Sequence, residues 1–136
     1  MASIIAGEGT GGGIFSEING TKAVLQNSIV ASNGGSDCQG TMTSKGYNLS
    51  SDDSCSFNAP GDLNNTDPNL WPLQDNGGPT QTMAPLAGSP AIDTGNPDGC
   101  TDGHHDLLKT DQRGMPRPDT EDSGGCDRGA YESQSD

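Results

Sequence analysis

Short apolar runs, separated by Gly, Asn and polar turn residues, dominate the first sixty positions. One run over 21–31 alternates up to Leu25, breaks at Asn27 and resumes at Ile29. A second unit has runs at 41–43 and 45–49, followed by the turn cluster 51–54. Val, Ile and Thr favour pleated strands, whereas Gly interrupts helices. The pattern therefore predicts short β-strands rather than helices.

The two units correspond loosely, at a spacing of roughly 20 residues. Such a period is typical of solenoids, in which each coil buries its apolar face on its neighbours and parallel strands pair between coils. Asn suits the interior turns, since it tolerates left-handed backbone angles and its amide can bond to neighbouring coils. We predict an all-β chain that forms a short parallel β-helix; a small antiparallel sandwich is the alternative.

The residue composition of the chain changes at about residue 60. Segments 61–68 and 74–79 are rich in Gly, Asn, Asp and Pro, which is turn chemistry. We expect β-helix coils over 1–59, and further coils with a loop-rich cap over 60–136, as one structural unit. The cap is expected to cover an open coil end. The apolar residues predicted to do so are Leu70, Trp71, Leu73, Met83, Leu86 and Ile92.

Composition limits the partners of this chain. Hydrophobic residues make up only 28 % of the 136 positions, which excludes a large core. The formal net charge is −13, with 19 acidic and 6 basic residues. Nucleic-acid phosphates and anionic membranes both require Lys and Arg, so these partners are disfavoured. Cations and neutral glycans remain compatible with the charge.

The four cysteines bear on the compartment. Cys38 and Cys55 are 17 positions apart, Cys100 and Cys126 are 26 apart, and neither pair has the C-x-x-C spacing of zinc or redox sites. We predict the sequential bridges Cys38–Cys55 and Cys100–Cys126, although three connectivities and four free thiols also fit the sequence. Bridges would indicate an oxidising compartment.

Targeting signals are not evident. No run approaches the about 18 apolar residues of a membrane span, and Met1 is not followed by a basic region and an apolar core. These features fit either a cytoplasmic protein or part of a longer secreted one. The cysteines favour the secreted alternative.

Four motifs occur in order in the C-terminal part. They are LQDNGGPT at 73–80, GSPAIDTG at 88–95, DQRGMPRP at 111–118 and CDRGAYE at 126–132. Together with NSIVA at 27–31, DC at 37–38 and GYNL at 46–49, they resemble the choice-of-anchor Q domain over residues 11–132. That family forms the C-terminal part of bacterial secreted or surface proteins related to polymorphic outer-membrane-protein repeats.

The resemblance implies a right-handed parallel β-helix, an extracellular or cell-surface location, and anchoring by a C-terminal signal. No such signal is evident in the four residues after Glu132. Arg128 stands where the family usually carries an apolar residue. The resemblance indicates little about activity.

Charged residues within the motifs are candidates for a structural network in the cap. We predict that Arg113, a planar donor with five N–H groups, bridges carboxylates and backbone carbonyls. A cation site and catalysis are the alternatives. The predicted members are Asp93, Asp111, Arg113, Asp127 and Glu132.

A calcium site is a second candidate. Asp98, Asp102 and Asp106 lie at four-residue spacing in a Gly-containing loop, and Ca²⁺ prefers carboxylate and carbonyl oxygens. The loop lacks the EF-hand pattern, so a solvated acidic loop is the alternative. Adjacent His104 and His105 lack a third well-spaced ligand for zinc.

We predict a non-catalytic structural or adhesive module at the C-terminal end of a secreted β-helix. Its open N-terminal coil end is expected to meet adjacent coils of a longer chain, or a second copy in oligomers or fibres. The alternative is a carbohydrate-binding or carbohydrate-cleaving domain that uses carboxylates such as Asp37, Asp52 and Asp53. An ice-binding surface would need more Thr than the sequence shows.

Overall fold

The computed structural model describes residues 4–5, 12–16, 22–119 and 125–134. The described chain is all-β and contains no helix. Its strands are two or three residues long, as expected where Gly, Asn and Pro interrupt the apolar runs. The seven strands are β1 (Ile4–Ile5), β2 (Ile14–Ser16), β3 (Ala23–Leu25), β4 (Ile29–Val30), β5 (Cys38–Gly40), β6 (Met42–Ser44) and β7 (Leu49–Ser50).

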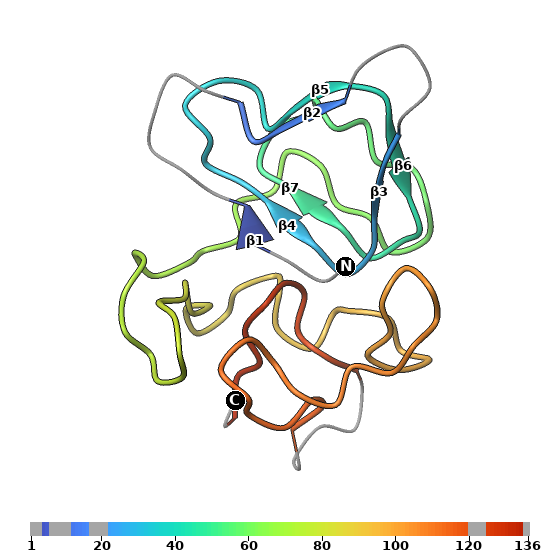
Figure 1. Cartoon of the computed structure of the whole chain (residues 1–136). Helices are drawn as coiled ribbons and strands as arrows, with labels where there is room; N and C mark the ends of the chain where they lie inside the picture. Colours follow the sequence, from blue (N-terminus) through green and yellow to red (C-terminus); the bar gives the residue numbers. More distant parts are fainter. Residues whose placement is uncertain (1–3, 6–11, 17–21, 120–124, 135–136) are drawn as a thin grey trace.

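The strands form three small parallel sheets, which the chain visits in rotation (Figure 1). The sheets are β1–β4–β7, β2–β5 and β3–β6. In each ladder the paired residues lie 19 to 25 positions apart, as in Ala23 with Met42 and Ile4 with Ile29. The prediction of short parallel strands at a spacing near 20 residues is therefore confirmed. The antiparallel alternative is wrong for these sheets.

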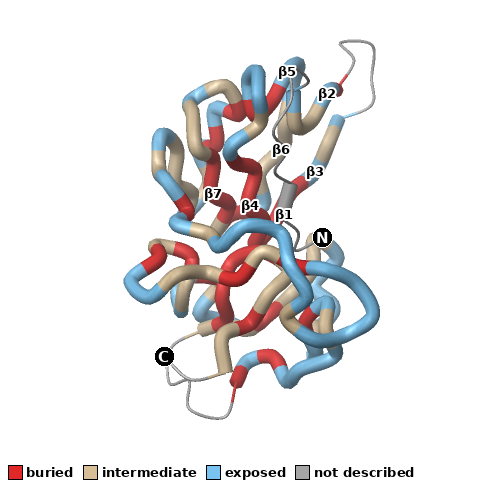
Figure 2. Tube along the Cα trace, turned by 90° about the vertical axis from the view of Figure 1, so that its left-hand side faces the viewer, coloured by how far each residue is buried: buried red, intermediate tan, exposed pale blue. Residues whose placement is uncertain are grey.

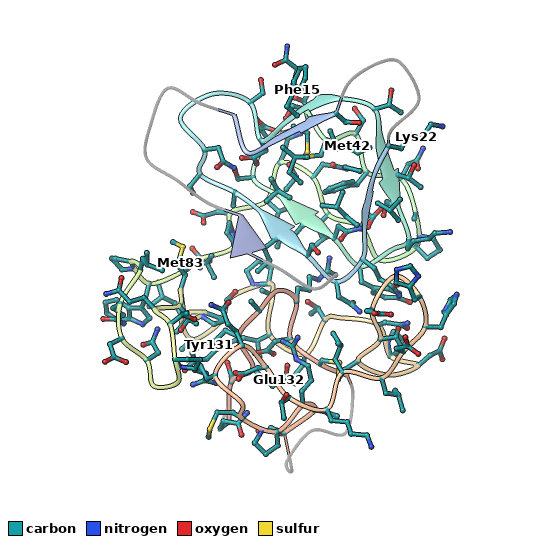
Figure 3. The ribbon with its side chains drawn as sticks, in the orientation of Figure 1. Phe15, Lys22, Met42, Met83, Tyr131 and Glu132 are labelled. Atoms are coloured by element: carbon teal, nitrogen blue, oxygen red, sulfur yellow. A yellow bond between two sulfur atoms is a disulfide. The ribbon has the colours of Figure 1, made fainter. Side chains whose placement is uncertain are left out.

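An interior apolar cluster is shared by all three sheets. Leu25 of β3, Val30 of β4 and Cys38 of β5 pack there with Cys55 and Phe57. The half-buried side chain of Met42 also packs against this cluster, whereas Phe15 is 67 % exposed and points away from the ribbon (Figure 3). In β2 and β3, alternate residues therefore face inward and outward.

Asn residues occupy the turns that link strands, as predicted. Asn27 has φ 49°, so it adopts the left-handed conformation between β3 and β4. The Asn48 side chain accepts a hydrogen bond from the Ser28 N–H (3.0 Å) and donates one to the Leu25 carbonyl (3.1 Å). Because Asn48 lies about one repeat further along the chain, its amide joins successive passes of the backbone.

The segment after β7 closes one end of the sheets. Leu63 forms a parallel bridge with Leu49, and the Tyr47 N–H donates to the Pro60 carbonyl (3.1 Å). The Cys38 N–H donates to the hydroxyl of Ser54 (2.9 Å). Backbone groups at this end are thus paired by residues 54–63.

The C-terminal half packs on the outer face of the β1–β4–β7 sheet. Ile29 and Val30 are neighbours in β4 with no exposed surface, and they point to opposite faces. Val30 joins the interior cluster, whereas Ile29 and Leu49 form a second cluster with Ala91, against which Leu70 packs. Buried positions run along β4 and β7 and continue into the C-terminal half (Figure 2).

This placement corrects the expectation that the tail covers a coil end. Trp71 and Leu73 are 51 % and 59 % exposed, so neither is a buried covering residue. They lie on an arm held by the antiparallel bridges Leu70–Pro85 and Gln74–Thr82. Met83, Leu86 and Ile92 are half-buried. The tail instead contributes Ala91 and Leu70 to the cluster on the outer face of this sheet.

Candidate functional site

Both predicted disulfides are present. Cys38 pairs with Cys55 at a Cα–Cα distance of 4.8 Å, and Cys100 pairs with Cys126 at 5.6 Å. The first bridge lies in the interior cluster, and the second joins two loops of the C-terminal half. The sequential pairing is confirmed, and no cysteine is free.

Arg113 has the bridging geometry that the sequence predicts. Its Nε and Nη2 donate to Oδ2 of Asp111 at 2.9 and 2.7 Å, and Nη2 also donates to the Glu132 carbonyl at 2.6 Å. The Glu132 N–H returns a hydrogen bond to the same Oδ2 (3.0 Å). The guanidinium lies 3.5 Å from the ring centroid of Tyr131, a cation–π distance. Arg113 and Asp111 thus hold the 111–115 turn to the last segment.

Arg117 is a second buried arginine that sequence reasoning missed. Its Nε donates to Oε2 of Glu132 at 2.6 Å, and the two side chains are 3 % and 0 % exposed. Its Nη1 and Nη2 donate to the carbonyls of Gly129 (2.9 Å) and Tyr131 (3.2 Å). Glu132 lies inside the C-terminal half next to Tyr131 (Figure 3). The sequence signal that could have indicated Arg117 was its position, four residues after Arg113 in the same motif.

Glu132 is the buried acid at the centre of this network. Burial raises the pKa of Glu132 to about 7, and the charge of Asp127 adds to the rise while Arg117 opposes it. Oε2 also accepts the Asp127 N–H at 3.2 Å, whereas Oε1 has no hydrogen-bond partner among the described residues. Glu132 therefore exchanges a proton near neutral pH, which is unusual for a carboxyl group.

Asp127 and Asp93 join the network in different ways. Asp127 accepts the N–H of Asp93 on Oδ1 (2.9 Å) and the N–H of Ser133 on Oδ2 (2.7 Å). Burial raises the pKa of Asp127 despite these hydrogen bonds. Asp93 contributes its backbone N–H, has φ 54°, and is itself exposed. The predicted carboxylate role of Asp93 in the network is not what the geometry shows.

Arg128 links the C-terminal half to the strands. Its Nη1 donates to the Asn48 carbonyl (2.9 Å) and its Nε to the hydroxyl of Thr94 (2.9 Å). The adjacent Gly129 N–H donates to the Asn27 carbonyl (2.7 Å). Arg128 is 4 % exposed, and burial lowers its pKa. A charged residue is accommodated at this position because its guanidinium binds the Asn48 carbonyl, which also accepts the Leu63 N–H (2.8 Å), and the Thr94 hydroxyl.

The three aspartates of the predicted calcium site form no shared cluster. Asp102 Oδ1 accepts the N–H groups of His104 (2.8 Å) and Asp106 (3.0 Å), which lowers the pKa of Asp102. Asp98 and Asp106 are exposed. Among the described residues, the acid, His and Cys side chains whose ligand atoms all lie within 4.8 Å are those of Cys100, Cys126 and Glu132. The aspartate loop is a turn held by Asp102.

We expect calcium to leave this turn unchanged. Adding Ca²⁺ or EDTA to the protein should not shift the melting temperature, because the Asp102 carboxylate already accepts hydrogen bonds from the N–H groups of His104 and Asp106 in its own loop. Differential scanning calorimetry measures the shift. A saturable rise with Ca²⁺ that Asp98→Asn abolishes, and Asp75→Asn on the separate 70–85 arm does not, would contradict this expectation.

The exposed histidines show no metal geometry. His104 and His105 are both exposed, and His105 has φ 69°. Neither belongs to a group of metal-ligand atoms within the described residues.

The carboxylates of the first half bind the backbone. Asp37 is 1 % exposed, and its Oδ2 accepts the N–H of Ser51 (2.8 Å) and of Asp52 (3.2 Å). Asp52 returns a hydrogen bond by accepting the Asp37 N–H on Oδ2 (3.0 Å), and hydrogen bonds from Ser54 help to lower the pKa of Asp52. Asp53 is exposed. These groups stabilise the turns that follow β4 and β7.

Comparisons with known proteins add no relative. No family model, no curated protein and no solved structure matches the chain. Among the described residues, no helix is long and apolar enough to cross a membrane.

Proposed function

We propose that this chain is the C-terminal end of a secreted or cell-surface parallel β-helix protein resembling the choice-of-anchor Q type, with a structural or adhesive role and no catalysis. The observation that carries the proposal is the rotation of successive strands through three parallel sheets. Each sheet receives one strand in each pass of 19 to 25 residues. Repetition of such a path is typical of solenoids, which supports the proposed β-helix.

General rules support the proposed handedness and location. Parallel strands joined by crossovers are almost always right-handed, because of the intrinsic twist of strands. Two disulfides support folding in an oxidising compartment, such as the cell exterior. A bacterial surface is the setting that the motif resemblance implies.

The buried charges support a structural role. Asp111, Arg113 and Arg117 each bind backbone groups or another buried charge. Asp37 and Asp52 hold turns in the same way. Carboxylates that are already bound to the backbone are poorly placed to act on a substrate in a cleft.

The strands β1, β2 and β3 offer a surface for association. Among the described residues, each of these strands has a hydrogen-bonded neighbour on one side only. Unpaired strand edges template pairing with another strand. The partner is either a preceding coil of a longer chain or a second copy. The net charge of −13 opposes self-association at low salt, so association should strengthen as salt screens it.

A charge on an edge strand tests this surface. Val24 of β3 is 47 % exposed, and we expect Val24→Lys to abolish concentration-dependent association at about 0.15 M salt. Thr43→Lys is the matched control, because Thr43 pairs with Val24 in register but lies on β6, at the opposite edge of the same two-stranded sheet. Sedimentation velocity over a concentration series measures the effect.

Two results would count against self-association through this edge. The wild-type chain could remain monomeric at every concentration and salt, or Thr43→Lys could disrupt assembly as strongly as Val24→Lys. In the first case, the remaining proposal is that the edge receives coils of a longer chain.

Glycan binding is a second candidate, favoured by one exposed aromatic. Trp71 is 51 % exposed on the 70–85 arm, and an accessible Trp ring offers an apolar face with a polar N–H. We expect a glycan array to show binding that Trp71→Ala removes and that Phe15→Ala, at an exposed aromatic on β2, retains. If the array shows no binding, glycan binding is excluded and only the structural role remains.

A further inference from the structure

Glu132 lies beside the disulfide of the C-terminal half. One carboxylate oxygen of Glu132 is within 4.8 Å of the sulfur atoms of both Cys100 and Cys126. Oε2 is held by the Nε of Arg117 and the N–H of Asp127. Oε1 has no hydrogen-bond partner among the described residues, and Glu132 has no exposed surface. A buried carboxyl oxygen without a hydrogen bond lowers the stability of the fold. Such an atom next to a reducible bond suggests a functional role.

We infer that Cys100–Cys126 is a thiol–disulfide exchange site in which Glu132 gives its proton to the departing sulfur. The substrate class is a small thiol or dithiol reductant. This inference does not depend on the structural function proposed above. An experiment can therefore reject either proposal without rejecting the other.

The exchange balances as follows. A thiolate attacks Sγ of Cys100 and forms a mixed disulfide, while the bond to Cys126 breaks and leaves its sulfur with the electron pair. Protonated Glu132 transfers its proton to the Cys126 thiolate and becomes a carboxylate beside Arg117. A second thiolate attacks the mixed disulfide, which releases the oxidised reductant and the Cys100 thiolate; that thiolate takes a proton from solvent. Two electrons pass from two thiols to the bridge.

Attack at Cys100 is favoured by its surroundings. The preceding residues Pro97 and Asp98 are exposed. Cys126 is followed instead by Asp127 and Arg128, which are 2 % and 4 % exposed. On this difference between their neighbours, the attacked sulfur is assigned to Cys100, which is itself 3 % exposed.

Four charged groups surround Glu132. Arg117 and Asp127 bind its Oε2 through a side chain and a backbone N–H, respectively. Asp111 accepts the backbone N–H of Glu132, and Arg113 binds its carbonyl. Burial raises the pKa of Glu132 to about 7, so the acid form is present at neutral pH, and Arg117 stabilises the carboxylate formed by the transfer.

The other disulfide is an internal control. Cys38 and Cys55 are as deeply buried, at 3 % and 4 % exposed, as Cys100 and Cys126, at 3 % and 2 %. They pack with Leu25, Val30 and Phe57, and no described carboxylate forms a similar group with their sulfur atoms. Ionisation of the reductant affects both bridges equally, so it cancels in the ratio of their reduction rates. The pH dependence of that ratio therefore reports on Glu132.

The test compares the rates at which the two bridges are reduced. The oxidised protein is exposed to dithiothreitol from pH 5 to 8.5, samples are alkylated, and each bridge is quantified by peptide mass spectrometry. In the wild type, we expect the rate ratio of Cys100–Cys126 to Cys38–Cys55 to fall about tenfold between pH 6 and pH 8, as Glu132 loses its proton. In Glu132→Gln, the ratio should be low and independent of pH.

Arg117→Met separates proton transfer from loosening of the structure. It breaks the same ion pair but keeps the acid, so the ratio should remain pH-dependent with a midpoint above that of the wild type. A flat wild-type ratio, an unchanged ratio in Glu132→Gln, or a ratio raised at every pH in that variant would overturn the inference. The last result would show that Glu132 only packs against the bridge.

Discussion

Replacing Arg117 by Met is expected to lower the free energy of unfolding by about 3–5 kcal/mol at pH 8, because it leaves a buried charge unpaired. Arg117 is 3 % exposed and pairs with Glu132 at 2.6 Å. It also satisfies the buried carbonyls of Gly129 and Tyr131, which Met cannot do. The loss should be smaller at pH 5, since a protonated Glu132 no longer needs a positive partner. Urea titration monitored by circular dichroism gives the free energy at each pH.

Lys109→Met is the matched control for this change. Lys109 is exposed on a neighbouring segment, so the same substitution removes one positive charge without exposing a buried acid. We expect a change of at most about 0.5 kcal/mol, as for most surface substitutions. If the two variants are equally stable at pH 8, the Arg117–Glu132 pair contributes nothing to the fold.

The stability of the wild-type protein is expected to decrease as the pH rises from 5 to 8. The pKa of Glu132 is 4.5 in an unperturbed chain and about 7 in the folded protein. The folded state therefore holds this proton more tightly, and the resulting stability is complete below about pH 4.5 and is lost as the pH rises through 7. At about 1.4 kcal/mol per pKa unit, the contribution is at most about 3 kcal/mol.

The variant Glu132→Gln should remove most of this pH dependence. Gln has nearly the same shape and no titrating proton, so unfolding free energies at pH 5 and pH 8 should differ much less than in the wild type. Asp127 contributes a smaller dependence of the same sign, because burial also raises its pKa. The lowered pKa of Asp52 acts below about pH 4 and does not affect this range. Equal slopes in wild type and variant would contradict the assignment to Glu132.

The strands of the first half could be predicted because their signals are local. The apolar runs ending at Leu25 and beginning at Ile29 became β3 and β4, and the break at Asn27 became a left-handed turn. Parallel pairing followed from the spacing of the two units. The sequential cysteine pairs, one of three connectivities that the sequence allows, were predicted correctly and join cysteines 17 and 26 positions apart.

The candidate site was only partly predictable. Motif position indicated Arg113 and Asp111, which bind each other two positions apart, although both also bind the distant backbone of Glu132. Arg117 and Arg128 were missed because their partners, Glu132 and the Asn48 carbonyl, are 15 and 80 positions away. No local pattern reports such contacts. The same holds for Asp93, whose side chain is exposed although its backbone N–H is bound.

The amino-acid sequence by itself determined that the chain is all-β, where β3, β4, β6 and β7 lie, and that turns fill the C-terminal half; among the possible cysteine pairings it favoured the sequential one. Only the tertiary structure decided that this half lies on the outer face of the β1–β4–β7 sheet, and that Glu132 meets both Arg117 and the Cys100–Cys126 bridge. The reason is physical. Strand and turn preferences act between neighbours in the chain, whereas the face that a loop covers depends on which distant apolar and charged groups can be buried together.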